Sequence, residues 1–422
     1  MGSGGKTTLM FQLARDFKSR VILTTTTHMA LDQLKGADRH IEVNDPGDVP
    51  DSNWDMVGDV IIFTGPPVET NRVGSPDPAS LMKILQLADA WDCPLLIESD
   101  GARKLPLKAP AEHEPPIPDF ADTVITVIGL SGLGKPLNEK WVHRPELFSR
   151  IADLKIGGEI HSSHLVSALV SDQGGLKNIP AGAQKILMIN QIDSFPNWKT
   201  FYDHLDYLLS CYHKIAFGVL EDQMFLEIHH RTAGVILAGG GSTRFGEPKQ
   251  LLDWKGIPLV KHVSGIALDA GLSPVIVVTG SEGEQVSEVL GEGVNTVHNP
   301  DWHKGQSTSV RVGVESLPAD VGGVVFMLVD QPLIPPDLIR LLRRTHARSQ
   351  AGIICPRVGD EAGNPVLFDR SVFIELMQLN GDQGGKAIFK NHKPRFVHWD
   401  DRNVQEDIDS PDDFRRISEI SG

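Results

Sequence analysis

The sequence has few of the features that mark secreted, membrane-bound or nucleic-acid-binding proteins. Its three cysteines, Cys93, Cys211 and Cys355, lie far apart without C-x-x-C spacing, which argues against structural zinc or a disulfide framework. No apolar run approaches the ~20 residues that cross a bilayer, and the N-terminus lacks the basic and apolar regions of a signal peptide. A formal net charge of -15 argues against general nucleic-acid or membrane-surface binding. We expect a cytoplasmic protein without nucleic-acid or membrane partners.

What the sequence does contain is an alternation of apolar, strand-like runs with amphipathic helical windows along its 422 residues. This alternation predicts the α/β class with parallel sheets. We expect two three-layer α/β domains, 1–230 and 231–422, with the boundary near residues 229–232. The expected strands cover residues 21–24, 59–63, 94–97, 123–128, 185–189, 235–238, 274–279, 323–329 and 365–368. The expected helices cover residues 7–17, 78–91, 198–209, 259–270, 335–349 and 370–379.

A glycine-rich loop directly after the apolar run 235–238 is the most informative feature of the chain. Its three successive glycines, 239–241, let the backbone approach phosphates and point N–H groups at them. Arg244 and Lys249 add the positive charge that a triphosphate requires. The spacing fits neither the dinucleotide fingerprint nor a Walker A loop. The loop predicts a nucleotide-phosphate site at the first strand of a sheet; the alternative is a glycine-rich turn with incidental basic residues.

Acidic residues follow later in the same half of the chain. Asp330 ends the apolar run 323–329, where parallel sheets bind ligands, and it can hold Mg²⁺ together with substrate phosphate oxygens. Asp407 and Asp409 are two residues apart and share a face on an extended segment. Either could be a second metal ligand, and we favour Asp409. The alternative interpretation is that these aspartates cap a turn and a helix.

Residues 233–420 resemble the molybdenum cofactor cytidylyltransferases, which are related to the cofactor guanylyltransferases. The resemblance rests on the glycine-rich loop with its GluProLysGlnLeuLeu continuation, the segment 299–309 ahead of Arg311, LeuValAspGlnPro, GlyAsnProValLeuPhe, GlyAspGlnGlyGlyLys and AspIleAspSerPro. It implies a Rossmann-like nucleotidyltransferase domain that transfers CMP from CTP to the terminal phosphate of Mo-molybdopterin, with Mg²⁺, releasing pyrophosphate. The residues expected at this site are Leu237, Ala238, Gly239, Gly240, Gly241, Arg244, Lys249, Ser309, Arg311, Asp330 and Asp409.

One motif departs from the cytidylyltransferase pattern. The loop reads Leu-Ala-Gly-Gly at 237–240, as in the guanylyltransferases, where cytidylyltransferases usually have Leu-Ala-Ala-Gly. The LysGlnLeuLeu and AspGlnPro segments are cytidylyltransferase-like, so we expect CTP. The alternatives are a guanylyltransferase that makes the guanine dinucleotide, a non-catalytic cofactor carrier or insertion chaperone, and a sugar- or alditol-phosphate nucleotidyltransferase.

The N-terminal segment Gly-Ser-Gly-Gly-Lys-Thr-Thr carries the core of a Walker A loop. Lys6 would reach the β- and γ-phosphates, Thr7 would ligate Mg²⁺, and the expected helix 7–17 would point its N-terminus at the phosphates. The first glycine of the motif and the strand that leads into it would precede residue 1, so we expect a P-loop-like domain lacking its first strand, or a native protein that begins upstream. The alternative is a glycine-rich start followed by a helix.

Two further segments support a nucleotide site in this half. The run 94–97 leads into Glu98 and Asp100, as in a Walker B strand, and either acid could hold Mg²⁺. The run 185–189 leads into Asn190-Gln191-Ile192-Asp193, close to the guanine-reading N-K-x-D motif. Asn190 would meet the base edge and Asp193 would accept hydrogen bonds from it. The expected N-terminal nucleotide-binding residues are Gly5, Lys6, Thr7, Thr8, Asp100, Asn190 and Asp193.

Residues 1 to roughly 220 resemble the selenium-dependent hydroxylase accessory proteins. The resemblance rests on the glycine-rich start, ThrThrThrThrHisMet, GluSerAspGlyAlaArgLysLeuProLeuLysAlaPro, HisGluProProIlePro and AsnGlnIleAsp. It implies a role in the maturation of molybdenum hydroxylases, with a hydroxylase apoenzyme as partner and GTP or ATP as ligand. The candidate site that the resemblance carries onto this chain is Lys6, Thr7, Asp100, Lys108, His113 and Glu114.

Overall fold

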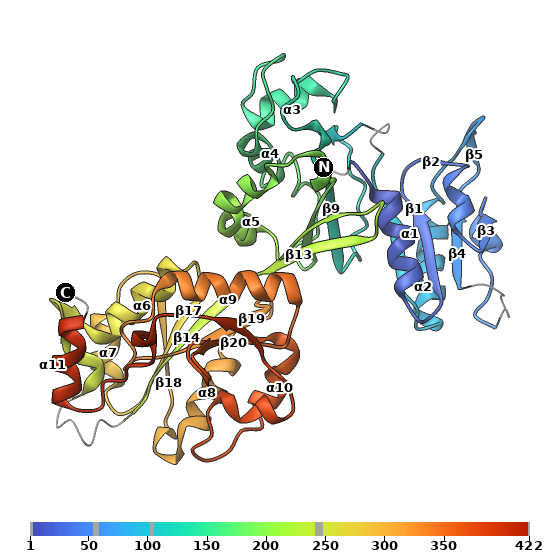
Figure 1. Ribbon diagram of the computed structural model, residues 1–422. Helices are drawn as coiled ribbons and strands as arrows, with labels where there is room; N and C mark the ends of the chain where they lie inside the picture. The colour runs from blue at the N-terminus through green and yellow to red at the C-terminus, as the bar shows by residue number, and fades with distance from the viewer. Residues whose placement is uncertain (1–2, 54–58, 102–104, 241–247, 421–422) are drawn as a thin grey trace. The chain divides into compact units, whose positions relative to one another are not determined.

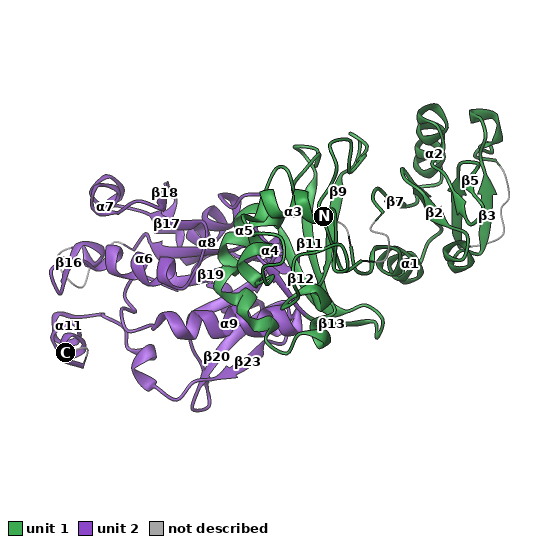
Figure 2. Cartoon of the chain, turned by 90° about the horizontal axis from the view of Figure 1, so that it is seen from above, with its two compact units in different colours: residues 1–226 green, residues 227–422 purple. Residues whose placement is uncertain are grey.

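The computed structural model describes residues 3–53, 59–101, 105–240 and 248–420. The chain divides into two compact units, Met1–Leu226 and Glu227–Gly422 (Figure 2). Both contain parallel β-strands with intervening helices, which confirms the predicted α/β class. Within the described ranges, no helix has the length and apolar character needed to cross a membrane.

The N-terminal unit contains two four-stranded sheets rather than one. The first has the order β3-β4-β1-β7, and every neighbouring pair is parallel. Alternate side chains of β1 enter different cores: Val21 and Leu23 pack with α1, whereas Ile22 packs with α2. Helices therefore cover both faces of this sheet. Its elements are β1 (Val21–Thr25), β3 (Arg39–Glu42), β4 (Val60–Thr64), β7 (Leu95–Glu98), α1 (Lys6–Asp16) and α2 (Pro78–Ala90).

The second sheet of this unit has the order β13-β12-β11-β9, in which β9, β11 and β12 are parallel. Leu187, Ile189 and Phe217 pack in one buried cluster with three helices. The elements are β9 (Thr123–Gly129), β11 (Gln184–Asn190), β12 (Lys214–Val219), β13 (Met224–His230), α3 (Pro145–Ala152), α4 (Ser162–Leu169) and α5 (Leu205–Cys211). The unit also has the short strands β2 (Met29–Ala30), β5 (Pro67–Glu69), β6 (Arg72–Val73), β8 (Leu107–Lys108) and β10 (Val142–His143).

The C-terminal unit is built on one eight-stranded sheet with the order β18-β17-β14-β19-β22-β20-β21, and β23 pairs with β20. Strands β18, β17, β14 and β19 are parallel, whereas β22 runs antiparallel to both of its neighbours. The strands are β14 (Thr232–Ala238), β15 (Asp253–Trp254), β16 (Ile257–Pro258), β17 (Val275–Thr279), β18 (Val294–His298), β19 (Gly323–Leu328), β20 (Ile353–Val358), β21 (Glu361–Ala362), β22 (Val366–Asp369) and β23 (Arg395–His398).

Helices cover both faces of this large sheet (Figure 1). Ile236 of β14 packs with α6 and α9 on one face, and its neighbour Val235 packs with α8 and α10 on the other. Because the central strands are buried on both sides, their sequences are continuously apolar. The helices are α6 (Leu259–Asp269), α7 (Gly283–Val289), α8 (Gln306–Glu315), α9 (Pro336–Ser349), α10 (Phe373–Leu376) and α11 (Pro411–Ile420).

The expected strands that are long and apolar occur within one to three residues of their predicted bounds. The expected helix at 370–379 is shorter, because only Phe373–Leu376 is α-helical. The expected helix at 198–209 begins as a 3-10 helix, Trp198–His204, before α5. The segment expected to link the domains is instead part of β13, and His229 is buried there with its ring 2.7 Å from Glu227.

We expect the core of the C-terminal unit to be sensitive at Ile236, which is fully buried in the central strand β14. Ile236→Ala leaves a cavity between the sheet and its helices, and should lower the free energy of unfolding by about 2–5 kcal/mol. Ile374→Ala is a matched control, because Ile374 is 72% exposed and should change stability by less than ~0.5 kcal/mol. Urea unfolding followed by circular dichroism measures both; equal effects would contradict this packing.

Candidate functional site

The glycine-rich loop and Asp330 lie at the same edge of the C-terminal sheet. Their strands, β14 and β19, are parallel neighbours, so the residues that follow them meet at the carboxyl end of the sheet. Gly239 lies in a tight space: an added Cβ would be 3.1 Å from Ser309 Oγ. Gln250 fastens the loop, because its Nε2 donates to the carbonyls of Ala238 at 2.7 Å and Gly240 at 2.9 Å.

Ser309 is held in place beside this loop at the start of α8. Asn299 follows β18 and donates from Nδ2 to Thr308 Oγ1 at 2.8 Å and Ser309 Oγ at 2.9 Å. All three side chains are buried. The Ser309 hydroxyl and the backbone of Gly239 therefore face each other at the carboxyl edge of the sheet, and Asn299 fixes this arrangement.

One lysine and three aspartates gather at the end of β19. Lys249 Nζ lies 2.8 Å from Asp409 Oδ1 and 4.0 Å from Asp330 Oδ2. The amide of Ile408 donates to the carbonyl of Asp330 at 2.9 Å, which ties the segment carrying Asp407 and Asp409 to the end of β19. Asp330 and the later segment with Asp409 therefore lie close to Lys249 in the fold, and their role as metal ligands stays a prediction.

The three aspartates of this cluster outnumber its one lysine, so negative charge is in excess. Burial and the nearby carboxylate of Asp407 raise the pKa of Asp330 to about 6, although Lys249 opposes the shift. Burial also raises the pKa of Asp407, against a hydrogen bond of 2.7 Å from Gln331 Nε2. Asp330 Oδ1 is buried, and none of the residues that the structure describes donates a hydrogen bond to it. A buried carboxylate oxygen without a donor, among further carboxylates, fits a bound cation.

A divalent cation there would need oxygen atoms from its substrate. Among the described residues, no three His, Cys, Asp or Glu side chains converge closely enough to hold a metal ion by themselves. Mg²⁺ commonly uses one or two carboxylates and takes its other ligands from phosphate and water. The donor set of Asp330 with Asp407 or Asp409 therefore fits Mg²⁺ bound with a nucleotide.

The structure describes only some of the remaining residues that were predicted for this site. Leu237 is a half-buried residue of β14, and Arg311 of α8 donates to the carbonyl of Leu379 at 3.0 Å. Gly241 and Arg244 lie outside the described residues. Gln250 and Gln331 were not predicted as residues of this site. Their only signal in the sequence is a polar residue directly after the loop lysine Lys249 and directly after the strand-ending Asp330.

The N-terminal unit brings its P-loop residues together with an acidic strand end. Thr7 Oγ1 donates to Glu98 Oε2 at 2.8 Å, and Gln33 Nε2 donates to Thr7 Oγ1 at 2.9 Å. Desolvation lowers the pKa of Lys6, against the nearby charges of Asp100 and Glu98. Burial raises the pKa of Glu98. A lysine, a hydroxyl and two acids are thus grouped at the start of α1, as phosphate and Mg²⁺ binding require.

Asn190 fastens the P-loop to the second sheet. Its Nδ2 donates to the carbonyl of Gly4 at 2.7 Å, and its Oδ1 accepts from the amide of Leu220 at 2.8 Å. Gly5 has φ 124°, and an added Cβ would lie 2.6 Å from Asn190 Nδ2, so glycine is required there. Both ends of the Asn190 amide are thereby engaged with the backbone. Asp193 is exposed on a 3-10 helix, Ile192–Ser194, directly after this residue.

A buried ion cluster adjoins this group. Lys108 is fully buried and contacts Asp100, the carbonyl of Gly101 at 2.7 Å, and Glu114 Oε2 at 2.7 Å. Despite burial, hydrogen bonds from Arg144 and Lys108 lower the pKa of Glu114 to about 2. Three predicted residues, Asp100, Lys108 and Glu114, therefore meet, whereas His113 and Thr8 are exposed.

Comparison with known proteins assigns each part of the chain to a family. The family profile described as MobA-like NTP transferase domain matches residues 234–396, and the profile described as YqeC protein matches residues 1–146. The uncharacterized protein YqeC of Escherichia coli (strain K12) is 33% identical over 201 residues, which cover 47% of this chain and 76% of that protein.

Two relatives match the C-terminal part. Nicotine blue oxidoreductase of Paenarthrobacter nicotinovorans is 26% identical over 195 residues, covering 44% of this chain and 95% of that protein. Molybdenum cofactor cytidylyltransferase of Escherichia coli (strain K12) is 24% identical over 189 residues, covering 43% of this chain and 92% of that protein.

The matching family model defines the C-terminal part as a nucleotidyltransferase. The chain belongs to the MobA-like NTP transferase family in its C-terminal part and to the YqeC family in its N-terminal part. Both resemblances that the sequence motifs indicated are confirmed.

The raised pKa of Asp330 predicts a pH-dependent cost to folding. Its carboxyl has an ordinary pKa near ~3.9 in the unfolded chain and about 6 in the folded protein. The folded state therefore binds the proton more tightly, and stability falls as the pH rises between these values. Asp330→Asn removes this loss, so the variant should gain on the order of 2–3 kcal/mol over the parent between pH 4 and pH 7.

Thermal unfolding of both proteins without divalent cations, across this pH range, measures the difference. Asp337→Asn is the control, because its side chain is 79% exposed on α9. A constant difference between Asp330→Asn and the parent at every pH would contradict the raised pKa.

Proposed function

We propose that the C-terminal unit transfers CMP from CTP to the terminal phosphate of Mo-molybdopterin, in the maturation of molybdenum hydroxylases. A phosphate oxygen of the cofactor attacks the α-phosphorus of CTP, and the bond to the bridging oxygen of the β-phosphate breaks. The products are molybdopterin cytosine dinucleotide and pyrophosphate. Cytidylyltransferase activity in one relative and the matching family support this reaction.

The observation that carries the proposal is the desolvated Asp330 next to the glycine-rich loop. The attacking phosphate is already ionised, so the reaction needs positioning and charge neutralisation rather than a strong general base. Mg²⁺ held by Asp330 would neutralise negative charge on the triphosphate. Asp407 and Asp409 are the candidates for a second ligand: Asp409 is the predicted one, while Asp407 contributes more to the raised pKa of Asp330.

Lys249 and the loop glycines have distinct proposed roles. The backbone at 239–241 cradles the phosphates, and Arg244 and Lys249 bring positive charge to them. Lys249 pairs with Asp409. A bound triphosphate competes for the same ammonium group, so Lys249 can exchange a carboxylate for a phosphate without losing an anionic partner.

The choice of base rests on the surroundings of Gly239. An alanine at this position, as the cytidylyltransferase motif has, would place its Cβ 3.1 Å from Ser309 Oγ. The absence of that methyl group is the observation that favours GTP as the second candidate. The adjoining LysGlnLeuLeu and AspGlnPro segments support CTP, which we propose as the substrate.

For the N-terminal unit we propose binding of GTP or ATP in the same pathway, with a molybdenum hydroxylase apoenzyme as partner. The grouping of Lys6, Thr7 and Glu98 at the start of α1 supports a site for the phosphates and Mg²⁺. Asp193 is the residue proposed to read guanine, whereas Asn190 acts on the loop through Gly4.

A competition assay tests the transferase reaction. The whole protein, given Mo-molybdopterin, Mg²⁺ and equal CTP and GTP, should form the cytosine dinucleotide, identified by mass. Asp330→Ala should lower turnover on the order of 10²–10³-fold, because it removes a charge stabiliser from the transition state. Asp337→Ala, on the exposed face of α9, is the matched control and should keep full turnover.

Two other results of this assay would change the proposal. A guanine dinucleotide would replace CTP by GTP as the substrate. Tight binding of the cofactor without pyrophosphate release, unchanged in Asp330→Ala, would refute the transferase and favour a carrier.

Nucleotide binding by the N-terminal unit is tested separately at Lys6. Lys6→Ala should weaken binding of the preferred nucleotide at least about tenfold, because the lysine neutralises phosphate charge. Lys18→Ala, exposed just after α1, is the control. Isothermal titration with GTP and with ATP measures both; equal affinities in the two variants would refute the P-loop assignment.

A further inference from the structure

Gln33 was not predicted as a nucleotide-binding residue, yet its side chain contacts one of those residues. It opens a short 3-10 helix, Gln33–Gly36, which follows β2 and the ThrThrThrThrHisMet segment. Its Nε2 reaches back to the start of α1 and donates to Thr7 Oγ1 at 2.9 Å. Thr7 in turn donates to Glu98 Oε2 at 2.8 Å. Three separate elements, α1, the 3-10 helix and β7, therefore meet at one hydroxyl group.

A backbone amide fixes the direction of these hydrogen bonds. The amide of Ala30 donates to Gln33 Oε1 at 3.0 Å, and a backbone N–H cannot accept. The oxygen of the Gln33 side chain must therefore face Ala30, which leaves its NH₂ group for Thr7. Because that NH₂ group can only donate, the Thr7 oxygen accepts from it and the single hydroxyl proton points to Glu98.

The backbone at Ala30 is itself held in place by packing. β2 pairs antiparallel with β6, with Met29 opposite Val73 and Ala30 opposite Arg72. Met29 is buried in the apolar cluster that includes Met10 of α1. The group that orients Gln33 thus belongs to the packed part of the unit rather than to an exposed turn.

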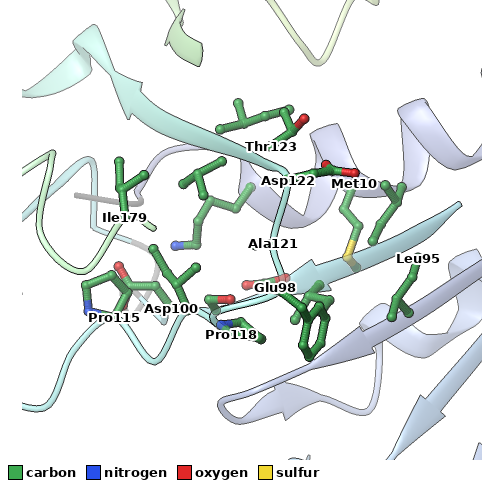
Figure 3. Close-up of a pocket in the computed structure, with 18 of the residues that line it drawn as sticks. Met10, Leu95, Glu98, Asp100, Pro115, Pro118, Ala121, Asp122, Thr123 and Ile179 are labelled. Atoms are coloured by element: carbon green, nitrogen blue, oxygen red, sulfur yellow. The ribbon is translucent and has the colours of Figure 1, made fainter. Parts of the chain in front are cut away.

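A Thr7 hydroxyl in this orientation is prepared for a cation. A hydroxyl oxygen has two lone pairs; Gln33 uses one, so among the residues that the structure describes one remains for Mg²⁺. The proton is directed away from that lone pair, to Glu98. Figure 3 shows Glu98 and Asp100 at a cavity that Lys6 also lines. A hydroxyl beside carboxylates suits Mg²⁺, which takes its other ligands from phosphate and water.

We propose that Gln33 is a positioning residue for Mg²⁺ at the N-terminal nucleotide site. It holds the Thr7 hydroxyl with its proton on Glu98 and a lone pair towards the cation before the nucleotide arrives. The inference rests on the proposed binding of GTP or ATP by this unit. Gln33 then contributes to affinity only when Mg²⁺ is present, because Lys6 and backbone N–H groups hold the phosphates themselves.

Isothermal titration of the whole protein with GTP and with ATP, each in Mg²⁺ and in EDTA, tests this role. The quantity compared is the ratio of the Kd in EDTA to the Kd in Mg²⁺. Gln33→Met keeps the side-chain length and should lower this ratio about fivefold, the loss expected for one hydrogen bond, with the Kd in EDTA unchanged. Gln86→Met, exposed on α2, is the matched control and should change neither value.

A double variant separates positioning from support of the fold. Thr7→Ala removes the hydroxyl, so adding Gln33→Met to it should leave the ratio as it is in Thr7→Ala, because Gln33 acts through Thr7. A further fall of the ratio in the double variant would overturn the proposal. Equal losses of affinity in Mg²⁺ and in EDTA for Gln33→Met alone would also overturn it, and would assign Gln33 to support of the loop.

Failure of the nucleotide site itself gives a different result. If the parent protein binds neither GTP nor ATP, or if Lys6→Ala binds them as the parent does, the proposed site is refuted, and the role of Gln33 with it. Nucleotide binding by the parent, with the same ratio in Gln33→Met, would refute the role of Gln33 alone.

Discussion

Negative charge at the carboxyl end of β19 is the constraint on which the C-terminal site depends. A carboxylate that is removed from water and placed near another carboxylate is stable only with a compensating cation. Asp330 meets both conditions, since it is desolvated and close to Asp407, with Lys249 4.0 Å away. The end of β19 thus carries excess negative charge, which a metal ion bound together with a nucleotide would neutralise.

In the N-terminal unit, cationic side chains of the protein itself compensate the buried carboxylates. Its acids also follow a parallel strand, but the fully buried Lys108 lies between Asp100 and Glu114, and Arg144 adds two hydrogen bonds to Glu114. Those charges compensate one another within the protein. Buried carboxylates of the N-terminal cluster therefore have cationic partners within the protein, whereas Asp330 is desolvated beside Asp407 with its nearest lysine 4.0 Å away.

The sequence predicted the long buried strands and the strand-ending acids because both follow from local patterns. The run at β14 is continuously apolar, and Asp330 stands at the end of another such run. Short edge strands such as β23 carry too few apolar residues to be recognised. The positions of Gln250 and Gln331 were not predictable, because their roles depend on carbonyl and carboxylate groups that come near only after folding. The separation of the first half into two sheets also depends on pairing that no local pattern encodes.

The hydrogen bond from Ile408 to the carbonyl of Asp330 joins residues far apart in the chain. During synthesis, the phosphate loop and Asp330 emerge well before Asp407 and Asp409, and four strands of the sheet, β20 to β23, are made in between. A nascent chain therefore holds the loop without the acidic segment that completes the site. The carboxyl edge of the sheet therefore acquires Asp407 and Asp409 only after β20, β21, β22 and β23 have been synthesised.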